Sequence, residues 1–258
     1  MAELEIIDPR QLYVVKSNDI IQRSRFSLSL TEQKVILYLI SKIYPNDEEF
    51  KEYEFSVSDF CRCIGLEPQS GANYNDVKDA IRQVRNKSMW IKLPNGTTSL
   101  VAWIEKARIV EGKGVIQIRL DNDLKPYLLQ LKEHYTQYQL IYTLRMKSRY
   151  SLRLYELVMS YFHDKLGTNK IRFSVDDLRS LLDAEKYSRY ANLHADVIKP
   201  AVAEINRYSD LDLTYIQIKE CRKTIAIEFV AKSKTALERI RIQEETDKEL
   251  GTNQLKLF

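Results

Sequence analysis

The sequence carries one short motif twice. Residues 55–60 read Phe-Ser-Val-Ser-Asp-Phe, and residues 173–178 read Phe-Ser-Val-Asp-Asp-Leu. An apolar run at helical spacing precedes each hexamer. A long amphipathic helical pattern follows it, and two alternating segments joined by a polar turn come last. A chain that repeats one order of elements is constrained to build the same unit twice.

The repeated order predicts the fold class. Helix, short helix, helix and β-hairpin is the order of a winged-helix unit, which binds DNA. We therefore expect an α+β protein with two tandem winged-helix domains related by internal duplication. The chain has 258 residues, which is enough for two modules that each bury a core. We place a first domain at 1–134, a second with a closing helix at 135–250, and a flexible tail at 251–258.

Composition limits the environment and the partners. Lys plus Arg exceed Asp plus Glu by 40 to 36, and this mild excess favours nucleic acid only if the bases gather on one face. The cysteines Cys61, Cys63 and Cys221 lack the spacing of a zinc site, so we expect reduced thiols. No export signal or apolar run of bilayer length occurs, which predicts a soluble, cytoplasmic protein without a membrane partner.

The first half contains a candidate recognition helix at about residues 73–87. Val77, Ile81 and Val84 fall on its inner face. Side chains that can bond base edges or phosphates fall on the outer face or its flanks, namely Asn75, Lys78, Arg82 and Arg85. An ordinary solvated helix face is the alternative.

An Asn-Gly turn at residues 95–96 predicts a hairpin of residues 89–93 and 100–104, which we interpret as the first wing. Lys92 and Asn95 would meet phosphates there, although basic residues on strand edges also prevent aggregation. A third strand at 114–120, a helix at 121–134 and a polar connector at 135–144 would complete this half.

The second half repeats the pattern. Cations cluster before and within its first helix, at Arg145, Lys147, Arg149 and Arg153. They oppose the helix dipole, so Lys147 and Arg149 are candidates for phosphate contact, and packing of their stems over the core is the alternative.

A long helix at about residues 188–208 is the second candidate recognition helix. Its groove-facing candidates are Arg189, Tyr190, Asn192 and Lys199, and those of the wing that follows are Arg222 and Lys223. His194 falls on the inner face, which predicts a packed, hydrogen-bonded histidine. Pro200 lies within the helix and predicts a kink.

Enzymatic functions are not indicated. The phosphate-binding motif Gly-x-x-x-x-Gly-Lys-Ser/Thr does not occur. The three histidines, His134, His163 and His194, are far apart, unlike the paired histidines that hold a metal beside the nucleophilic tyrosine of a nickase. We expect no catalytic residue, no metal and no cofactor.

Several segments resemble one known family. They are Phe-Ser-Leu-Ser-Leu-Thr-Glu-Gln-Lys at 26–34, Tyr-Thr-Gln-Tyr at 135–138, Met-Lys-Ser-Arg-Tyr-Ser-Leu-Arg-Leu-Tyr-Glu-Leu at 146–157, and Ile-Lys-Pro-Ala-Val-Ala-Glu-Ile-Asn at 198–206. In this order they resemble the theta-type plasmid replication initiators that bind iterons. The resemblance spans about Asn18 to Lys232.

The resemblance implies a bacterial protein that binds short direct repeats at an origin with two winged-helix domains. It implies monomers on the repeats, dimers on the protein's own operator, melting of adjacent AT-rich DNA and recruitment of host replication proteins. Much of the sequence-specific contact would fall to the second domain, by position to Arg189, Asn192 and Lys199. Self-association would use the first domain's strands, near Leu100–Leu120.

The C-terminus adds a partner. After a charged helix at about residues 235–250, the tail ends in Gln254-Leu255-Lys256-Leu257-Phe258. This pattern resembles the pentapeptide by which bacterial proteins dock on the replicative sliding clamp. Leu255, Leu257 and Phe258 would fill an apolar groove and Gln254 would bond to its rim. The alternative is a tail that packs on the second domain.

Two other functions stay open. A transcriptional repressor with tandem winged helices would show the same helices and charges but would bind an inverted repeat. A site-specific nickase would cleave a strand of supercoiled origin DNA. Direct repeats around the protein's own gene would favour an initiator.

Overall fold

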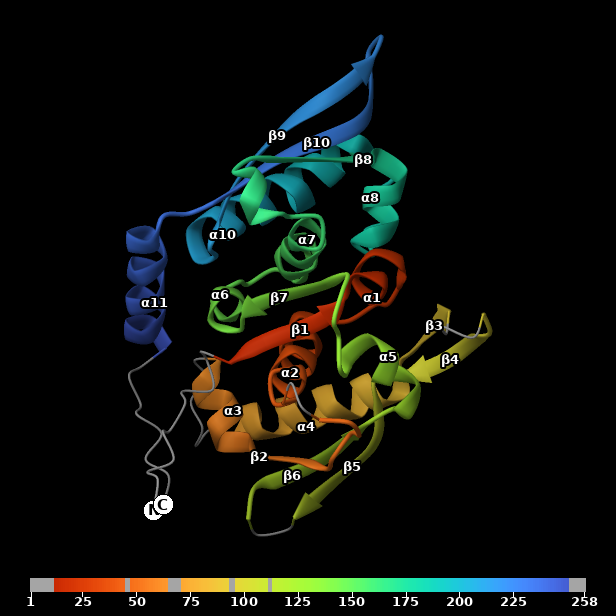
Figure 1. The fold of residues 1–258 in the computed structure, drawn as a ribbon, viewed down its shortest axis with the longest axis vertical. Coiled ribbons are helices and arrows are strands. Elements are labelled where there is room, and N and C mark those ends of the chain that lie inside the picture. The colour runs from red at the N-terminus through yellow and green to blue at the C-terminus, as the bar shows by residue number, and fades with distance from the viewer. Residues whose placement is uncertain (1–11, 45–46, 65–70, 93–95, 111–112, 251–258) are drawn as a thin grey trace.

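The computed structural model describes residues 12–44, 47–64, 71–92, 96–110 and 113–250. The two halves of the chain are stacked along the long axis of the molecule (Figure 1). In the described part of the chain, no helix combines the length and the apolar character that crossing a bilayer requires.

Both halves contain the same winged-helix unit. In the first, α2 (Leu30–Ile40) precedes β2 (Tyr53–Ser56), α3 (Val57–Cys63), α4 (Gly71–Asn86), β5 (Ile104–Val110) and β6 (Val115–Leu120). In the second, α7 (Arg149–Met159) precedes η3 (Asp164–Leu166), β8 (Asn169–Ser174), α8 (Val175–Leu181), α9 (Tyr190–Leu193), the π-helical η4 (His194–Ile198), α10 (Lys199–Tyr208), β9 (Leu211–Glu220) and β10 (Lys223–Ser233). The sheet orders, β2-β6-β5 and β8-β10-β9, correspond strand for strand. The predicted fold class is confirmed.

The repeated hexamer ends a strand and begins a helix in each half. The Ser56 hydroxyl accepts a hydrogen bond from the Asp59 amide, and the Ser174 hydroxyl accepts one from the Asp177 amide. Such a serine satisfies an amide that the first helical turn leaves without a partner. Phe55 and Phe173 are buried just before these caps. The hexamer therefore fixes the angle between the first strand and the short helix.

The position predicted for the first wing is wrong. The Asn-Gly hairpin does form, as β3 (Ser88–Lys92) and β4 (Thr98–Ala102), but it makes a separate two-stranded sheet. The strand pair that corresponds to the second wing is β5–β6. The hairpin β3–β4 is thus an insertion between α4 and β5, and it has no counterpart in the second half of the described chain. A turn motif predicts that a hairpin forms, not which sheet it joins.

The segment between the halves also differs from the prediction. Only η2 (Asn122–Leu124) and α5 (Lys125–Leu128) form in place of the helix at 121–134. The expected connector is β7 (Tyr135–Gln139), which pairs antiparallel with β1 (Tyr13–Ser17), and α6 (Ile141–Leu144), which is buried. Local sequence could not show a strand whose partner lies at the other end of the half. A domain boundary after His134 stays a prediction.

Helix α7 packs against both halves. Its side chains from Tyr150 to Val158 are all buried, which is the mark of a helix enclosed on every side. It packs on α10 from the second half and on α1 (Asn18–Arg23) and α2 from the first. The C-terminal helix α11 (Ala236–Leu250) packs on α6, and its Gln243 donates to the side chain of Gln139 at the end of β7. The halves are therefore joined by packing and not by a linker alone.

Buried cations hold this junction. Arg153 donates to the carbonyls of Ile21 and Ser24 in the first half, at 2.7 and 3.0 Å, and to that of Leu181 in the second, at 3.0 Å. Lys16 pairs with Glu156 of α7, and the Glu156 carboxylate also accepts the Tyr138 hydroxyl. Such groups are stable in the interior because each has polar partners.

Candidate nucleic-acid interface

Helix α4 presents the first exposed polar face. Val77, Ile81 and Val84 are buried, whereas Asn75 and Arg82 are exposed, as predicted for an amphipathic helix. Arg85 is exposed as well. Arg82 makes an exposed ion pair with Asp79 at 3.1 Å, and Lys78 lies 5.4 Å from the centre of the Tyr74 ring. Exposed pairs of this kind are weak, so the guanidinium can exchange Asp79 for another acceptor.

Three basic residues lie on the first wing or beside it. Lys106 and Arg108 lie on β5, and Lys113 lies in the exposed turn before β6. Arg108 pairs with Glu52 at 3.3 Å and was not predicted as a site residue. Only the pairing order of the sheet, which local sequence does not show, identifies it as a wing residue. Of the predicted wing residues, Lys92 lies at the end of β3 in the inserted hairpin, and Asn95 lies outside the described residues.

The second candidate recognition helix consists of α9, η4 and α10 in succession. Leu193, Val197 and Ile205 are buried, and Asn192 and Lys199 are exposed, as predicted. Before this run begins, Arg189 is exposed too. These outward side chains are small, polar or basic, which suits close approach to a groove.

A π-helical turn precedes Pro200. The Lys199 amide donates to the His194 carbonyl, five residues back, and Pro200 follows as one of the first residues of α10. Proline has no amide hydrogen and cannot continue an α-helical ladder. The wider turn is how the helix accommodates the irregularity that the sequence predicted at this point.

His194 connects the helix to the wing. Its Nε2 lies 2.8 Å from the Tyr215 hydroxyl on β9, and its ring packs between those of Tyr190 and Tyr215. The prediction of a packed, hydrogen-bonded histidine is confirmed. Burial raises the pKa of the Tyr190 and Tyr215 hydroxyls, so both stay protonated at neutral pH. Tyr190 is half-buried at the N-terminal end of the helix, where its ring packs on that of His194.

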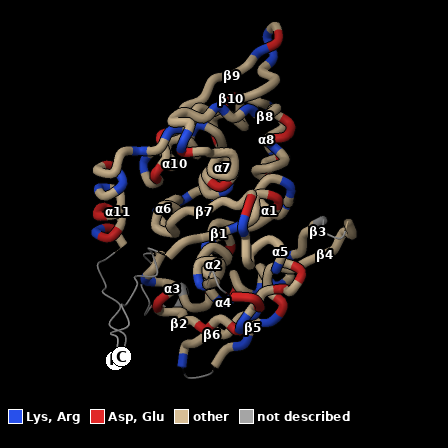
Figure 2. Tube along the Cα trace, in the orientation of Figure 1, with Lys and Arg blue, Asp and Glu red and all other residues tan. Residues whose placement is uncertain are grey.

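The second wing extends beyond the helices (Figure 1). Strands β9 and β10 pair up to Glu220 and Lys223, which leaves a turn of Cys221 and Arg222. Arg222 and Lys223 are both exposed at this tip. Figure 2 shows basic and acidic residues side by side there. The tip is therefore a mixed surface on which two cations are accessible.

The cations around the start of α7 divide into two kinds. Arg145 is buried against the Tyr208 ring and pairs with Glu249 and Glu245 of α11. Arg149 is half-buried and pairs with Asp183 at 2.7 Å. Lys147 is exposed, and it is the backbone amide, not the ammonium, that donates to Glu204. Lys147 is thus the accessible candidate for phosphate contact in this cluster.

The cysteines are free thiols, with Cys61 and Cys63 buried and Cys221 exposed. Within the described ranges, no group of three metal-ligating side chains comes together. The tail residues Gln254, Leu255, Leu257 and Phe258 lie outside the described residues.

Fold and exposed faces together define the chain as a DNA-binding protein of the tandem winged-helix class. Residues 13–159 match the family model described as "Initiator Replication protein, WH1", and residues 174–230 match "Initiator Rep protein, WH2". The chain belongs to the family of initiator replication proteins.

Relatives and a solved structure are similar to this chain. A replication initiation protein of Escherichia coli is 26% identical over 79% of this chain, and the match spans 65% of that protein. The PI protein of Escherichia coli is 25% identical over 51% of this chain and 47% of its own length. The crystal structure of the Pi initiator protein in complex with iteron DNA superposes with a TM-score of 0.74, at 18% identity, over 87% of this chain and 98% of that chain.

Proposed function

We propose that this protein initiates plasmid replication by binding direct repeats of double-stranded origin DNA with both winged-helix domains. The observation that carries the proposal is the presence of two equivalent helix-plus-wing faces in one chain of the initiator family. A solved relative of the same fold is bound to iteron DNA, which supports the same class of ligand here. Catalysis has no part in the proposal; the protein would act by binding and recruitment in the bacterial cytoplasm.

The first face would use α4 and the β5–β6 wing, and the second would use the α9–α10 run and the β9–β10 wing. Arg82 and Arg85 represent the first face, and Arg189, Asn192 and Lys199 the second. Arginine and asparagine can bond base edges bidentately, and lysine can neutralise phosphates. Because α7 packs against both halves, the two faces would approach DNA at a set spacing, which reduces the entropic cost of the second contact.

Footprinting on the DNA around the protein's own gene tests the proposal. Protection of several direct repeats is the expected result. Protection of a single inverted repeat alone would contradict it and favour a repressor. Incubation with supercoiled origin DNA and a divalent metal ion provides a second test, because nicked product would indicate a nickase instead.

We also propose that dimers form through the first domain's strands, near Leu100–Leu120. Strand β5 is an edge strand of its sheet, and Trp90 and Leu100 form a cross-strand pair that is 65% and 55% exposed. Exposed edges and apolar pairs favour association. Crosslinking should map to these strands in the wild type and weaken in a Trp90→Ser variant. Crosslinks confined to the second domain would refute the assignment.

We further propose that the C-terminal pentapeptide docks on the bacterial sliding clamp. The sequence of the tail supports this, because three large apolar residues and a glutamine stand at the spacing of a short linear ligand. Replacing Leu257 and Phe258 by alanine should abolish capture of the clamp, because these residues would be the buried anchors. Lys256→Ala is the matched control and should leave capture unchanged. A lowered melting temperature with unchanged clamp binding would instead indicate a tail that packs on the domain.

A further inference from the structure

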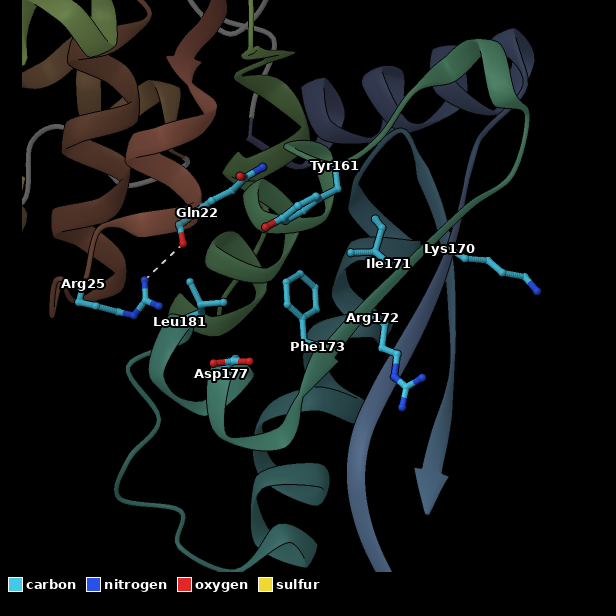
Figure 3. A pocket seen from close by; sticks show the side chains of 9 residues that line it. All are labelled: Gln22, Arg25, Tyr161, Lys170, Ile171, Arg172, Phe173, Asp177 and Leu181. Atoms are coloured by element: carbon cyan, nitrogen blue, oxygen red, sulfur yellow. Dashed lines mark hydrogen bonds between the residues drawn. The ribbon is translucent and has the colours of Figure 1, made fainter. Parts of the chain in front are cut away.

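A cavity of about 490 Å³ lies between the two halves, away from both proposed DNA faces (Figure 3). Gln22 of α1 and Arg25, which follows that helix, line it from the first half. Tyr161 and four consecutive residues of β8, Lys170 to Phe173, line it from the second. Neither the candidate recognition helices nor the wings contribute residues to this cavity.

Strand β8 borders this cavity with an open edge. It is an outer strand of the order β8-β10-β9, and it pairs with β10 along one side. In an antiparallel pair, alternate residues direct their amide and carbonyl groups away from the partner strand. Within the described residues, Lys170–Phe173 make no backbone hydrogen bond outside their sheet. The outward groups of β8 therefore have no backbone partner within the described chain.

The two faces of β8 have different chemistry. Ile171 and Phe173 are buried, and the Phe173 ring meets that of Tyr161 edge-on at 5.7 Å. Lys170 and Arg172 are exposed and point away from the cavity, on the opposite face of the strand (Figure 3). The carboxylate of Asp177 already accepts a hydrogen bond from the Ser174 hydroxyl.

We propose that the β8 edge binds an extended segment of a partner protein as an added strand. Neighbouring side chains on one face of a sheet interact across strands. An occupant that matches β8 would therefore alternate apolar residues, which face Tyr161 and Phe173, with acidic residues, which face Lys170 and Arg172. The fitting partner is a segment of alternating acidic and apolar residues.

The edge itself argues against two other occupants. Its outward groups alternate amides with carbonyls, and a peptide satisfies both, whereas the phosphates of DNA would meet carbonyl oxygens with like partial charge. A second copy paired through β8 would bring Lys170 and Arg172 opposite the same cations, which is unfavourable. The added strand would also lie beside Arg25 of the first half, so it would contact both halves at once.

The test uses the full chain and a short labelled peptide that alternates valine and glutamate. Fluorescence anisotropy should report binding, and hydrogen exchange should slow at the outward amides of β8. A lysine version of the peptide, and the glutamate version methylated at alternate backbone nitrogens, should each bind at least about tenfold more weakly.

A pair of double variants separates this site from general charge. Lys170→Glu with Arg172→Glu should weaken binding of the glutamate peptide about tenfold. Lys219→Glu with Lys232→Glu, which alters exposed cations on the other two strands of the same sheet, should not. Melting curves of both double variants should match that of the wild type.

Four results would overturn the proposal. They are no binding of the glutamate peptide, equal binding of the methylated peptide, slowed exchange of the β8 amides by duplex DNA that also displaces the peptide, and self-association of the free protein that the peptide abolishes. The third would assign the edge to nucleic acid, and the fourth would assign it to a second copy of this chain.

Discussion

The cations at the junction between the halves and those on the outer faces are the same residue types in opposite surroundings. We call the first set the junction cations: Lys16, Lys34, Arg145 and Arg153. The second set is the outer cations: Arg82, Arg85, Arg189, Lys199, Arg222 and Lys223. The junction cations are wholly or largely buried on carbonyl or carboxylate partners, whereas the outer cations are exposed.

Burial, not net charge, therefore decides what a basic residue does in this protein. A buried cation with fixed partners contributes to stability, and removing it or its partner leaves an unsatisfied polar group. An exposed cation contributes little to stability but remains available to phosphates and bases. Changes to the two sets should therefore separate cleanly between unfolding and DNA binding.

The largest effect should come from Arg153→Met. Its guanidinium serves carbonyls in both halves and lies 4.6 Å from the centre of the Phe26 ring. Burial lowers the pKa of Arg153 to about 10, so it is still charged at neutral pH. We expect urea unfolding to show a loss of about 3–5 kcal/mol. Arg82→Met is the control and should change stability by less than about 0.5 kcal/mol. Equal losses of stability in Arg153→Met and Arg82→Met would contradict the distinction between junction and outer cations.

A somewhat smaller effect is expected for Glu156→Gln. The change removes the carboxylate that neutralises buried Lys16 and accepts the Tyr138 hydroxyl. Leaving the ammonium without its counter-ion should cost about 3 kcal/mol in the free energy of unfolding. Adding Lys16→Met should recover part of the loss, because the isolated charge is then removed. A double variant no more stable than Glu156→Gln would show that the two side chains do not act as a pair.

Lys34 should make the free energy of unfolding depend on pH. Its ammonium donates to the Leu144 carbonyl at 2.7 Å, and burial lowers the pKa of Lys34 to about 8. The folded form therefore releases a proton that the unfolded chain keeps up to about pH 10.4, so stability rises with pH in this window. Relative to Lys34→Met, the wild type should gain about 2 kcal/mol between about pH 7.5 and pH 9.5. Denaturant titrations measure the unfolding free energies. An equal difference between the wild type and Lys34→Met at both pH values would contradict this.

The smallest effect concerns the wing tip. Lys223→Ala should leave the free energy of unfolding unchanged within about 0.5 kcal/mol. If the ammonium meets a phosphate, the variant should weaken binding to all duplexes alike and lower the salt dependence by about one unit. Anisotropy titrations with repeat and unrelated DNA over a series of salt concentrations measure both quantities. A loss confined to the repeat would mean that Lys223 reads bases instead.

The sequence was sufficient for the repeated parts of the fold. The hexamer and the helical spacing of Val77, Ile81 and Val84 are local signals, and each corresponds to an observed element. The first wing was misplaced because β5 alternates poorly: three consecutive residues, Ala107 to Ile109, are exposed. Its identity as a wing is evident only from the pairing order of the sheet.

The junction was the part that the sequence could not reveal. Tyr135–Gln139 contains mostly polar and aromatic residues, and its partner strand Tyr13–Ser17 is distant in the chain. Arg149 and Arg153 stand four residues apart on one helix, yet one is half-buried beside Asp183 and the other serves buried carbonyls. Which arginine is accessible depends on the packing of both halves around α7, which no local pattern encodes. The contacts of each outer cation with DNA stay predictions.

Both halves of the protein, held as one body, should bind a single DNA repeat. Hydroxyl-radical footprinting on one direct repeat with the full chain tests it most directly, using Arg82→Ala with Arg85→Ala for the first half and Arg189→Ala with Lys199→Ala for the second. Each double variant should lose protection at one end of the repeat, the two ends being different, while the melting temperature is unchanged. Full protection and unchanged affinity for the first-half variant would contradict it.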